Sequence, residues 1–216
     1  MEDLYKYEKE LYQQGYNLIA GVDEVGRGPL IGPVVAAACV LPSDFKLEGL
    51  TDSKKLTEKK RIIYNEYIKE HAIAYSIVEI SPKEIDKINI YQASRKAMMK
   101  AIKNISDRVE YVLVDAMPLP DLKIPSNSII KGDTKSISIA AASVLAKVYR
   151  DGLMYKLDKK HPQYGYASHK GYPTKKHLEA LEKHGLIKGY RKTYGPVKKI
   201  IEKEETIWWN FKKTHF

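Results

Sequence analysis

The apolar run IGPVVAAACVL, residues 31–41, limits the fold of this 216-residue chain more than any other stretch. It contains no charged side chain, and it is apolar at consecutive positions rather than at alternate ones. A strand with this pattern is buried on both faces. The run therefore predicts a central sheet flanked by helices, and the chain is long enough to bury such a core.

Segments typical of strands and helices fill the rest of the chain, which predicts an α/β fold. Further strands are expected in NLIAGVDE, HAIAYSIVEI, EYVLVD and SNSII. Helices are expected at about residues 3–14, in TEKKRIIYNEYIKE after Thr57 as cap, from SPKEIDKIN to YQASRKAMMKAIKN, in ISIAAASVLAKVYRDGLMYKLDKK, and near 174–184 and 196–205. The stretch HPQYGYASHKGYPT is expected to be a loop. Strands come first and helices last, which predicts a catalytic core over residues 1–160 and a C-terminal substrate-binding region over 161–216 packed on it.

Some classes of protein are excluded early. The start MEDLYKYEKE has neither a basic nor an apolar signal region, and no segment approaches about 20 apolar residues, so we expect a soluble, cytoplasmic protein with no membrane contact. The single cysteine, Cys39, lies inside the apolar run and cannot form an internal disulfide or a zinc cluster. It is expected to be a small buried apolar side chain.

Charge is distributed unevenly along the chain, whose net charge is +10. Residues 1–151 hold 22 basic and 21 acidic side chains, whereas residues 152–216 hold 15 and 6. The basic tail also carries aromatic residues: Tyr164, Tyr166, Tyr172, Tyr190, Tyr194, Trp208 and Trp209. Basic and aromatic side chains together suit phosphates and bases, so the tail indicates either nucleic-acid binding or a solvated surface over an aromatic core.

Acidic residues follow the apolar strands. Asp23 and Glu24 end one strand, Asp115 ends YVLVD, and Asp133 precedes the long Ala-rich helix. Each has an ordinary structural alternative: a solvated strand end, a turn former or a helix cap. Together, at strand ends where side chains leave a rigid core, they form a set of carboxylates that suits Mg²⁺ or Mn²⁺.

Two other site types do not fit. The six histidines show no H-E-x-x-H spacing, which argues against a zinc hydrolase. In GRGPLIG, Ile31 stands where a dinucleotide-binding G-x-G-x-x-G motif needs its third glycine, and no phosphate-binding Gly-Lys-Ser/Thr follows.

Five motifs in order, GVDEVGRGPLIGPVVAAACVLP, DSKKL, VDAMPLP, KGDTKSISIAAASVLAKVYRD and HKGYPT, closely resemble bacterial ribonuclease HII over roughly residues 10–200. The resemblance implies an RNase H-like fold, with a central mixed β-sheet flanked by helices and a small C-terminal helical substrate-binding region. It implies divalent-metal catalysis as well. It also implies hydrolysis on the 5′ side of ribonucleotides, in RNA/DNA hybrids or singly embedded in duplex DNA, to give 3′-hydroxyl and 5′-phosphate ends. A monomer is the family expectation.

The resemblance also implies residue roles. The family's metal-binding acids fall on Asp23, Glu24, Asp115 and Asp133, the same set that the strand ends indicate. Gly26, Arg27 and Gly28 match the ribose-reading turn, and Tyr172 matches the tyrosine that stacks at the RNA-to-DNA junction. Lys54 and Arg150 match positions that contact phosphate.

This sequence departs from the family pattern at Val25, at Tyr149 and in YRKTYGPV, which stands for a more usual His-Arg-x-Ser-Phe-x-Pro-Val. The last departure concerns the packing of the tail. The end, TIWWNFKKTHF, has no match and either extends a duplex contact or packs a terminal helix. Two alternatives stay open: an enzyme similar to ribonuclease HIII that prefers long hybrids, and a non-catalytic nucleic-acid binder.

Overall fold

A five-stranded sheet forms the centre of the protein, in the order β3-β2-β1-β4-β5. The computed structural model describes the backbone of residues 3–215 and the side chains of residues 3–203, 205 and 206. The strands are β1 Ile19–Val25, β2 Val34–Val40, β3 Ala74–Ile80, β4 Tyr111–Asp115 and β5 Ser126–Ile129. The β1–β2 and β2–β3 pairs are antiparallel, whereas β1–β4 and β4–β5 are parallel, which confirms the expected mixed sheet.

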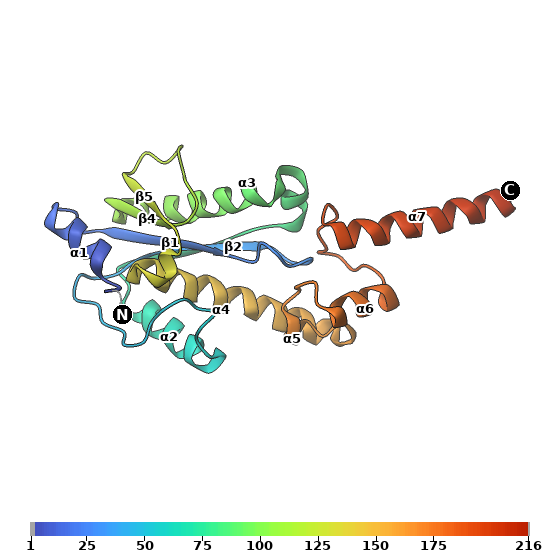
Figure 1. The fold of residues 1–216 in the computed structure, drawn as a ribbon, viewed down its shortest axis with the longest axis horizontal. Coiled ribbons are helices and arrows are strands. Elements are labelled where there is room, and N and C mark those ends of the chain that lie inside the picture. Colours follow the sequence, from blue (N-terminus) through green and yellow to red (C-terminus); the bar gives the residue numbers. More distant parts are fainter. Residues whose placement is uncertain (1–2, 216) are drawn as a thin grey trace.

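Helices cover both faces of this sheet, with α3 on one side and α2 and α4 on the other (Figure 1). Their bounds are α1 Lys6–Gln13, α2 Glu58–His71, α3 Pro82–Lys103, α4 Ile137–Lys160, α5 Tyr166–His169, α6 Lys175–His184 and α7 Gly195–His215. No helix within residues 3–215 is long and apolar enough to cross a membrane.

Strand β2 shows why its sequence is apolar throughout. Its alternate residues Val34, Ala36, Ala38 and Val40 pack in the cluster under α3. The residues between them, such as Cys39, pack against α4 and α2. Both faces of the strand are therefore core, as its continuous apolar pattern predicts.

Short polar side chains set where the main helices begin. Thr57, Ser81 and Ser136 each accept a hydrogen bond from the backbone N–H three residues later, at the starts of α2, α3 and α4. Asp133, for which a capping role was one alternative, lies instead in a 3-10 turn, Gly132–Thr134, before α4. Its carboxylate is therefore not the cap of that helix.

The stretch expected to be only a loop, HPQYGYASHKGYPT, contains a 3-10 turn at Pro162–Tyr164 and the single-turn helix α5, so that expectation was wrong in part. Gly165 and Lys170 adopt left-handed backbone conformations (φ 72° and 50°) that start and end α5. The final helix also continues past the expected residue 205 to His215. The side chains of the Trp208–Trp209 pair lie outside the described residues.

A separate cluster joins the C-terminal part of the chain to the core. Tyr164, Tyr166, Leu181, Tyr190 and Val197 pack against three residues from the core segments, Leu30, Ile31 and Met154. Helix α7 then extends away from the body of the protein (Figure 1). The segment after β1 is thus packed between the sheet and the C-terminal region.

Strand β1 touches the first turn of α4 at Gly21. A Cβ atom on Gly21 would lie 2.0 Å from the Ser138 carbonyl carbon and 2.2 Å from the Ile139 nitrogen. Both are backbone atoms and cannot rotate aside as a flexible side chain could. Only glycine allows β1, and the acids at its end, to lie this close to α4.

We expect Gly21→Ala to destabilise the fold by about 3 kcal/mol or more, because strand and helix must separate to admit the methyl group. Gly152→Ala is the matched control. Apart from the backbone of its own helix, no atom lies within 4 Å of a Cβ at Gly152, so alanine in this helix should stabilise by about 0.5–1 kcal/mol. Urea denaturation of the two variants measures the difference, and equal midpoints would contradict the assigned contact.

Candidate active site

The ends of two parallel strands bring the acidic residues together. β1 and β4 pair in parallel with Val22 opposite Val114, so the next residue in each strand is an aspartate, Asp23 or Asp115. Glu24 follows on β1. The carboxyl ends of parallel strands meet at one edge of a sheet, where side chains leave the core while their backbone stays rigid.

Asp133 reaches the same place from the 3-10 turn before α4. The Gly132 N–H donates a 2.7 Å hydrogen bond to Asp115 Oδ1, which ties this turn to the end of β4. A Cβ on Gly132 would lie 2.6 Å from Ile139 Cδ1, so glycine lets the turn pack closely. The four acids expected from the sequence therefore lie near enough to one another for their charges to interact.

Burial raises the pKa of every one of these acids, and the charge of at least one neighbouring acid adds to the rise in each case. Asp23 is 6% exposed, and burial, with the charges of Glu24 and Asp115, raises its pKa well above the ordinary value. Burial raises the pKa of Glu24 to about 7, although Arg27 acts in the opposite direction. Burial raises the pKa of Asp133 to about 6 and also raises that of Asp115. The fold concentrates negative charge that a cation would stabilise.

The carboxylates fit a hard divalent cation by their chemistry. All the donors are carboxylate oxygens, and Glu24 Oε2 is buried with no hydrogen-bond partner among the described residues. The arrangement is not a preformed cage, since no three His, Cys, Asp or Glu side chains in the described part of the chain meet as one group that could hold an ion. Cation binding therefore involves some side-chain adjustment.

Residues of the DSKKL motif lie beside the acids. Burial lowers the pKa of Lys54, but the charges of Asp52, Asp23 and Asp133 together raise it above its ordinary value. The charge of Asp52 also raises the pKa of Asp133. Lys54 therefore lies beside the acids, and its contact with phosphate stays a prediction. Asp52 is a fifth nearby acid that the sequence reasoning passed over.

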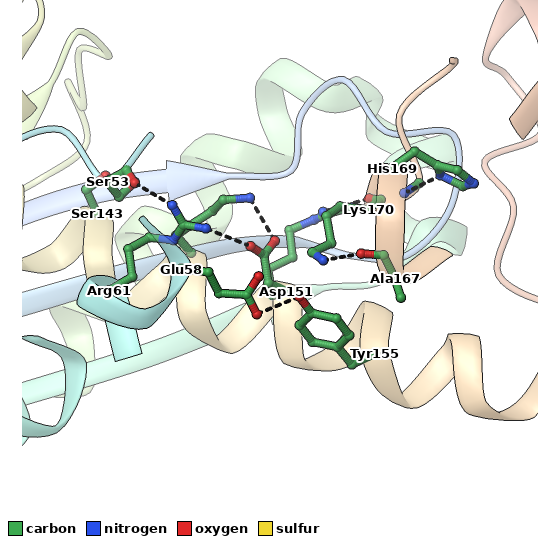
Figure 2. Close-up of polar contacts among 12 residues, drawn as sticks. Ser53, Glu58, Arg61, Ser143, Asp151, Tyr155, Ala167, His169 and Lys170 are labelled. Atoms are coloured by element: carbon green, nitrogen blue, oxygen red, sulfur yellow. Dashed lines mark hydrogen bonds and ion pairs between the residues drawn. The ribbon is translucent and has the colours of Figure 1, made fainter. Parts of the chain in front are cut away.

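A buried ion network holds the loop that carries Lys54. Asp151 of α4 accepts from Lys147 at 2.7 Å and lies 3.9 Å from the Arg61 guanidinium of α2 (Figure 2). Arg61 in turn donates to the Ser53 carbonyl at 3.0 Å. The Ser53 hydroxyl lies 2.9 Å from the hydroxyl of Ser143, whose hydrogen bond lowers the pKa of Asp23. None of these supporting residues was predicted.

The expected ribose-reading turn lies next to Glu24 and Tyr172. Arg27 Nη1 is 3.4 Å from Glu24 Oε1. A Cβ on Gly28 would lie 3.2 Å from Tyr172 Cε1, so the tyrosine ring stands directly beside this glycine. Gly26 has φ 91°, and a Cβ there would lie 2.1 Å from Arg150 Nε. Gly26 is therefore required by its conformation and by its contact with Arg150, whereas a side chain at Gly28 would press against the Tyr172 ring.

Arg150 has a different position from the one expected. It is fully buried, and its guanidinium donates to the carbonyls of Pro33, Lys170 and Ile31 at 3.3, 3.1 and 3.3 Å. Direct phosphate contact does not fit this burial, because all three donor groups face protein carbonyls. Arg150 instead joins the segment after β1 to the segment that carries Tyr172.

Known proteins resemble this chain in sequence and in fold. The family model for ribonuclease HII matches residues 20–194. Ribonuclease HII of Bacillus mycoides is 56% identical, and that of Bacillus cereus strain Q1 is 54% identical, each over 93% of this chain and 78% of the relative. The crystal structure of the ribonuclease H2 from Pyrococcus horikoshii has a TM-score of 0.74 and 27% identity, covering 86% of this chain and 97% of that one.

We expect Mn²⁺ to raise the melting temperature far more at pH 8 than at pH 5.5. The raised pKa values mean that the metal-free fold is favoured at low pH. It loses stability as pH rises from about 4, where these carboxyls ionise in the unfolded chain, to about 6 to 7, where Asp133 and Glu24 ionise in the folded protein. Mn²⁺ binds the ionised form and offsets that repulsion. Thermal melts with Mn²⁺ or with chelator at both pH values measure the shift.

The control for this experiment is Asp23→Asn, which removes one buried charge. It should melt higher than the wild type in chelator at pH 8 and respond less to Mn²⁺. Equal Mn²⁺ shifts at the two pH values would show that these carboxyls do not bind the ion.

Proposed function

Since the chain belongs to the ribonuclease HII family and is an endoribonuclease acting on RNA/DNA hybrids, we propose that it cleaves on the 5′ side of ribonucleotides, including single ones embedded in duplex DNA. The products are then a 3′-hydroxyl and a 5′-phosphate. The observation that carries this proposal is the position of the Gly26–Gly28 turn. It lies beside Tyr172 and follows directly after two of the four grouped acids.

The proposed ligands of the divalent metal are Asp23, Glu24, Asp115 and Asp133. Members of this family depend on divalent metal ions, and Mg²⁺ or Mn²⁺ in a two-metal site suits an all-carboxylate donor set. When bound there, the metal supplies an acidified water and neutralises charge on the scissile phosphate and the leaving 3′ oxygen. Rigid strand ends keep the carboxylates in place for that task.

Other residues position the substrate. Lys54 lies in the loop that Arg61 holds through the Ser53 carbonyl. Its positive charge near the acids attracts a phosphate of the substrate backbone. Backbone N–H groups of the Gly26–Gly28 turn hydrogen-bond the 2′-hydroxyl, the group that separates RNA from DNA. Tyr172 is 38% exposed, so its ring can stack on the sugar at the junction.

We further propose that residues 1–160 form the catalytic core and that residues 161–216 form the region that binds the duplex, in a protein that acts as a monomer. Support comes from the excess of basic residues after position 151 and from the packing of Tyr164, Tyr166 and Tyr190 against the segment after β1. In this proposal the basic region lies next to the ribose-reading turn, where it can hold the flanking phosphates.

One cleavage assay tests this function. Three duplexes of the same sequence are compared, all-DNA, one embedded ribonucleotide and full RNA/DNA hybrid, each with Mg²⁺, Mn²⁺ or chelator. We expect metal-dependent nicking on the 5′ side of the single ribonucleotide and an intact all-DNA duplex. Cleavage of the long hybrid alone would favour the HIII-like alternative, and binding without cleavage would favour a non-catalytic binder.

We expect Asp115→Asn to lower kcat by roughly 100-fold or more, because the grouped acids lose a metal ligand. Affinity for the hybrid should stay unchanged, since the basic region does not depend on Asp115. Asp121→Asn, which removes an exposed acid paired with Arg95, is the matched control and should cleave normally. Strong residual cleavage by Asp115→Asn would remove this residue from the proposed ligand set.

For Tyr172→Ala, we expect kcat/KM on the single-ribonucleotide duplex to fall roughly 10- to 100-fold, the value of about one lost stacking contact. The loss on the long hybrid should be smaller, because a hybrid offers no RNA-to-DNA junction at each cut. Tyr91→Ala, at a similarly exposed tyrosine on α3, is the control. An equal loss on both substrates would contradict the role of Tyr172 at the junction.

A further inference from the structure

Arg191 is a fully buried arginine of the YRKTYGPV segment, and none of the described carboxylates lies within ion-pair distance of it. Its guanidinium donates instead to four oxygens. These are the carbonyls of Gly26 at 2.6 Å, Arg27 at 2.8 Å and Gly32 at 3.0 Å, and the Tyr194 hydroxyl at 2.9 Å. A buried charge with only neutral acceptors is unfavourable unless its hydrogen bonds are complete.

Two of these acceptors belong to the ribose-reading turn itself. A trans peptide points its C=O and N–H in opposite directions. The peptide that carries the Gly26 carbonyl ends in the Arg27 N–H, and the next one joins the Arg27 carbonyl to the Gly28 N–H. Because Arg191 holds both carbonyls from the interior, the two N–H groups face away from it.

These two N–H groups are free within the described structure. No described residue accepts a hydrogen bond from the backbone nitrogen of Arg27 or Gly28. The carbonyls of the same two peptides, those of Gly26 and Arg27, accept charge-assisted hydrogen bonds from Arg191. These bonds polarise each peptide and strengthen its N–H as a donor. The turn thus presents two adjacent, enhanced donors beside the acids.

Arg191 is itself fixed from several sides. Its backbone N–H donates to the Leu30 carbonyl at 2.8 Å, and its guanidinium lies 5.1 Å from the centre of the Tyr194 ring. The Tyr194 hydroxyl donates to the Arg27 carbonyl at 2.6 Å. Asp86 accepts from the backbone nitrogens of Lys192 and Thr193 at 3.0 Å each. The donors of Arg191 are therefore held in one geometry.

We propose that Arg191 is a positioning residue for ribose recognition, which aims the N–H groups of Arg27 and Gly28 at the 2′-hydroxyl of the ribonucleotide. This inference rests on the proposed function, because it gives these N–H groups the task of reading that hydroxyl. It assigns to the C-terminal region a part in distinguishing RNA from DNA in addition to binding phosphates.

Arg191→Lys is the main test. A lysine keeps the charge but offers one flexible ammonium in place of the planar fork that spans three carbonyls. We expect kcat on the single-ribonucleotide duplex to fall roughly 100-fold, the usual effect of about 1 Å of misplacement. The affinity for an all-DNA duplex, and the fraction of molecules that bind it, should equal those of the wild type.

Two further variants separate positioning from stability. Ile102→Val removes one methyl group from the core under α3 and should lose stability without a change in kcat. Tyr194→Phe deletes one hydrogen bond to the Arg27 carbonyl and one to Arg191, and should show a several-fold loss of kcat in the same direction. If Arg191→Lys does not fold, Tyr194→Phe carries the test alone.

The outcomes distinguish the inference from the function. Failure of the wild type to cut the single-ribonucleotide duplex would overturn the proposed function, and the inference with it. Normal wild-type cleavage with unchanged kcat in Arg191→Lys, or in a folded Tyr194→Phe if the lysine variant is lost, would overturn the inference alone. A loss of kcat matched by an equal loss of all-DNA binding would also overturn it, since that pattern indicates a smaller folded fraction.

Discussion

The contact between β1 and the first turn of α4 is the constraint on which the rest of the protein depends. At Gly21 the strand lies directly against the backbone of Ser138 and Ile139. The contact places the end of β1, with Asp23, beside Ser143 of α4 and the turn that carries Asp133. A side chain at position 21 would move the strand away from the helix. The grouping of the acids follows from backbone packing more than from any attraction among them, because the acids repel each other.

The site combines two unfavourable kinds of burial. On one side, carboxyl groups lie close together, and burial raises their pKa values. On the other, Arg150 and Arg191 are buried and donate mainly to backbone carbonyls. Neither of these two arginines forms an ion pair with any of the described carboxylates. Each set is instead available for a task, the carboxylates for a cation and the arginines for the shape of the Gly26–Gly28 turn.

The features that depend on neighbouring residues in the chain, such as strand burial and helix bounds, could be predicted from the sequence. The apolar run in β2 predicted burial on both faces, and the stretch ISIAAASVLAKVYRDGLMYKLDKK has the bounds of α4. The acids could be found because strand ends are visible in sequence. The roles of Arg150 and Arg191 could not, because most of their partners are carbonyls more than a hundred positions away, and a carbonyl is present at every residue. The Tyr166–His169 helix was missed because it is a single turn between two left-handed residues, which is too short to show a helical pattern in the sequence.

One face of helix α4 carries a residue that supports the acids and a residue that supports the Gly26–Gly28 turn. Ser143 lies near Asp23, whereas Arg150, two turns further along, holds the segment after β1. The helix therefore fixes the distance between these two residues, at about 5.4 Å for each turn. One inserted residue between these positions would rotate Arg150 by about 100° relative to Ser143. Arg150 could then no longer hold the segment after β1 while Ser143 stays near Asp23. The number of residues between these two positions therefore matters to the site as much as the residues themselves.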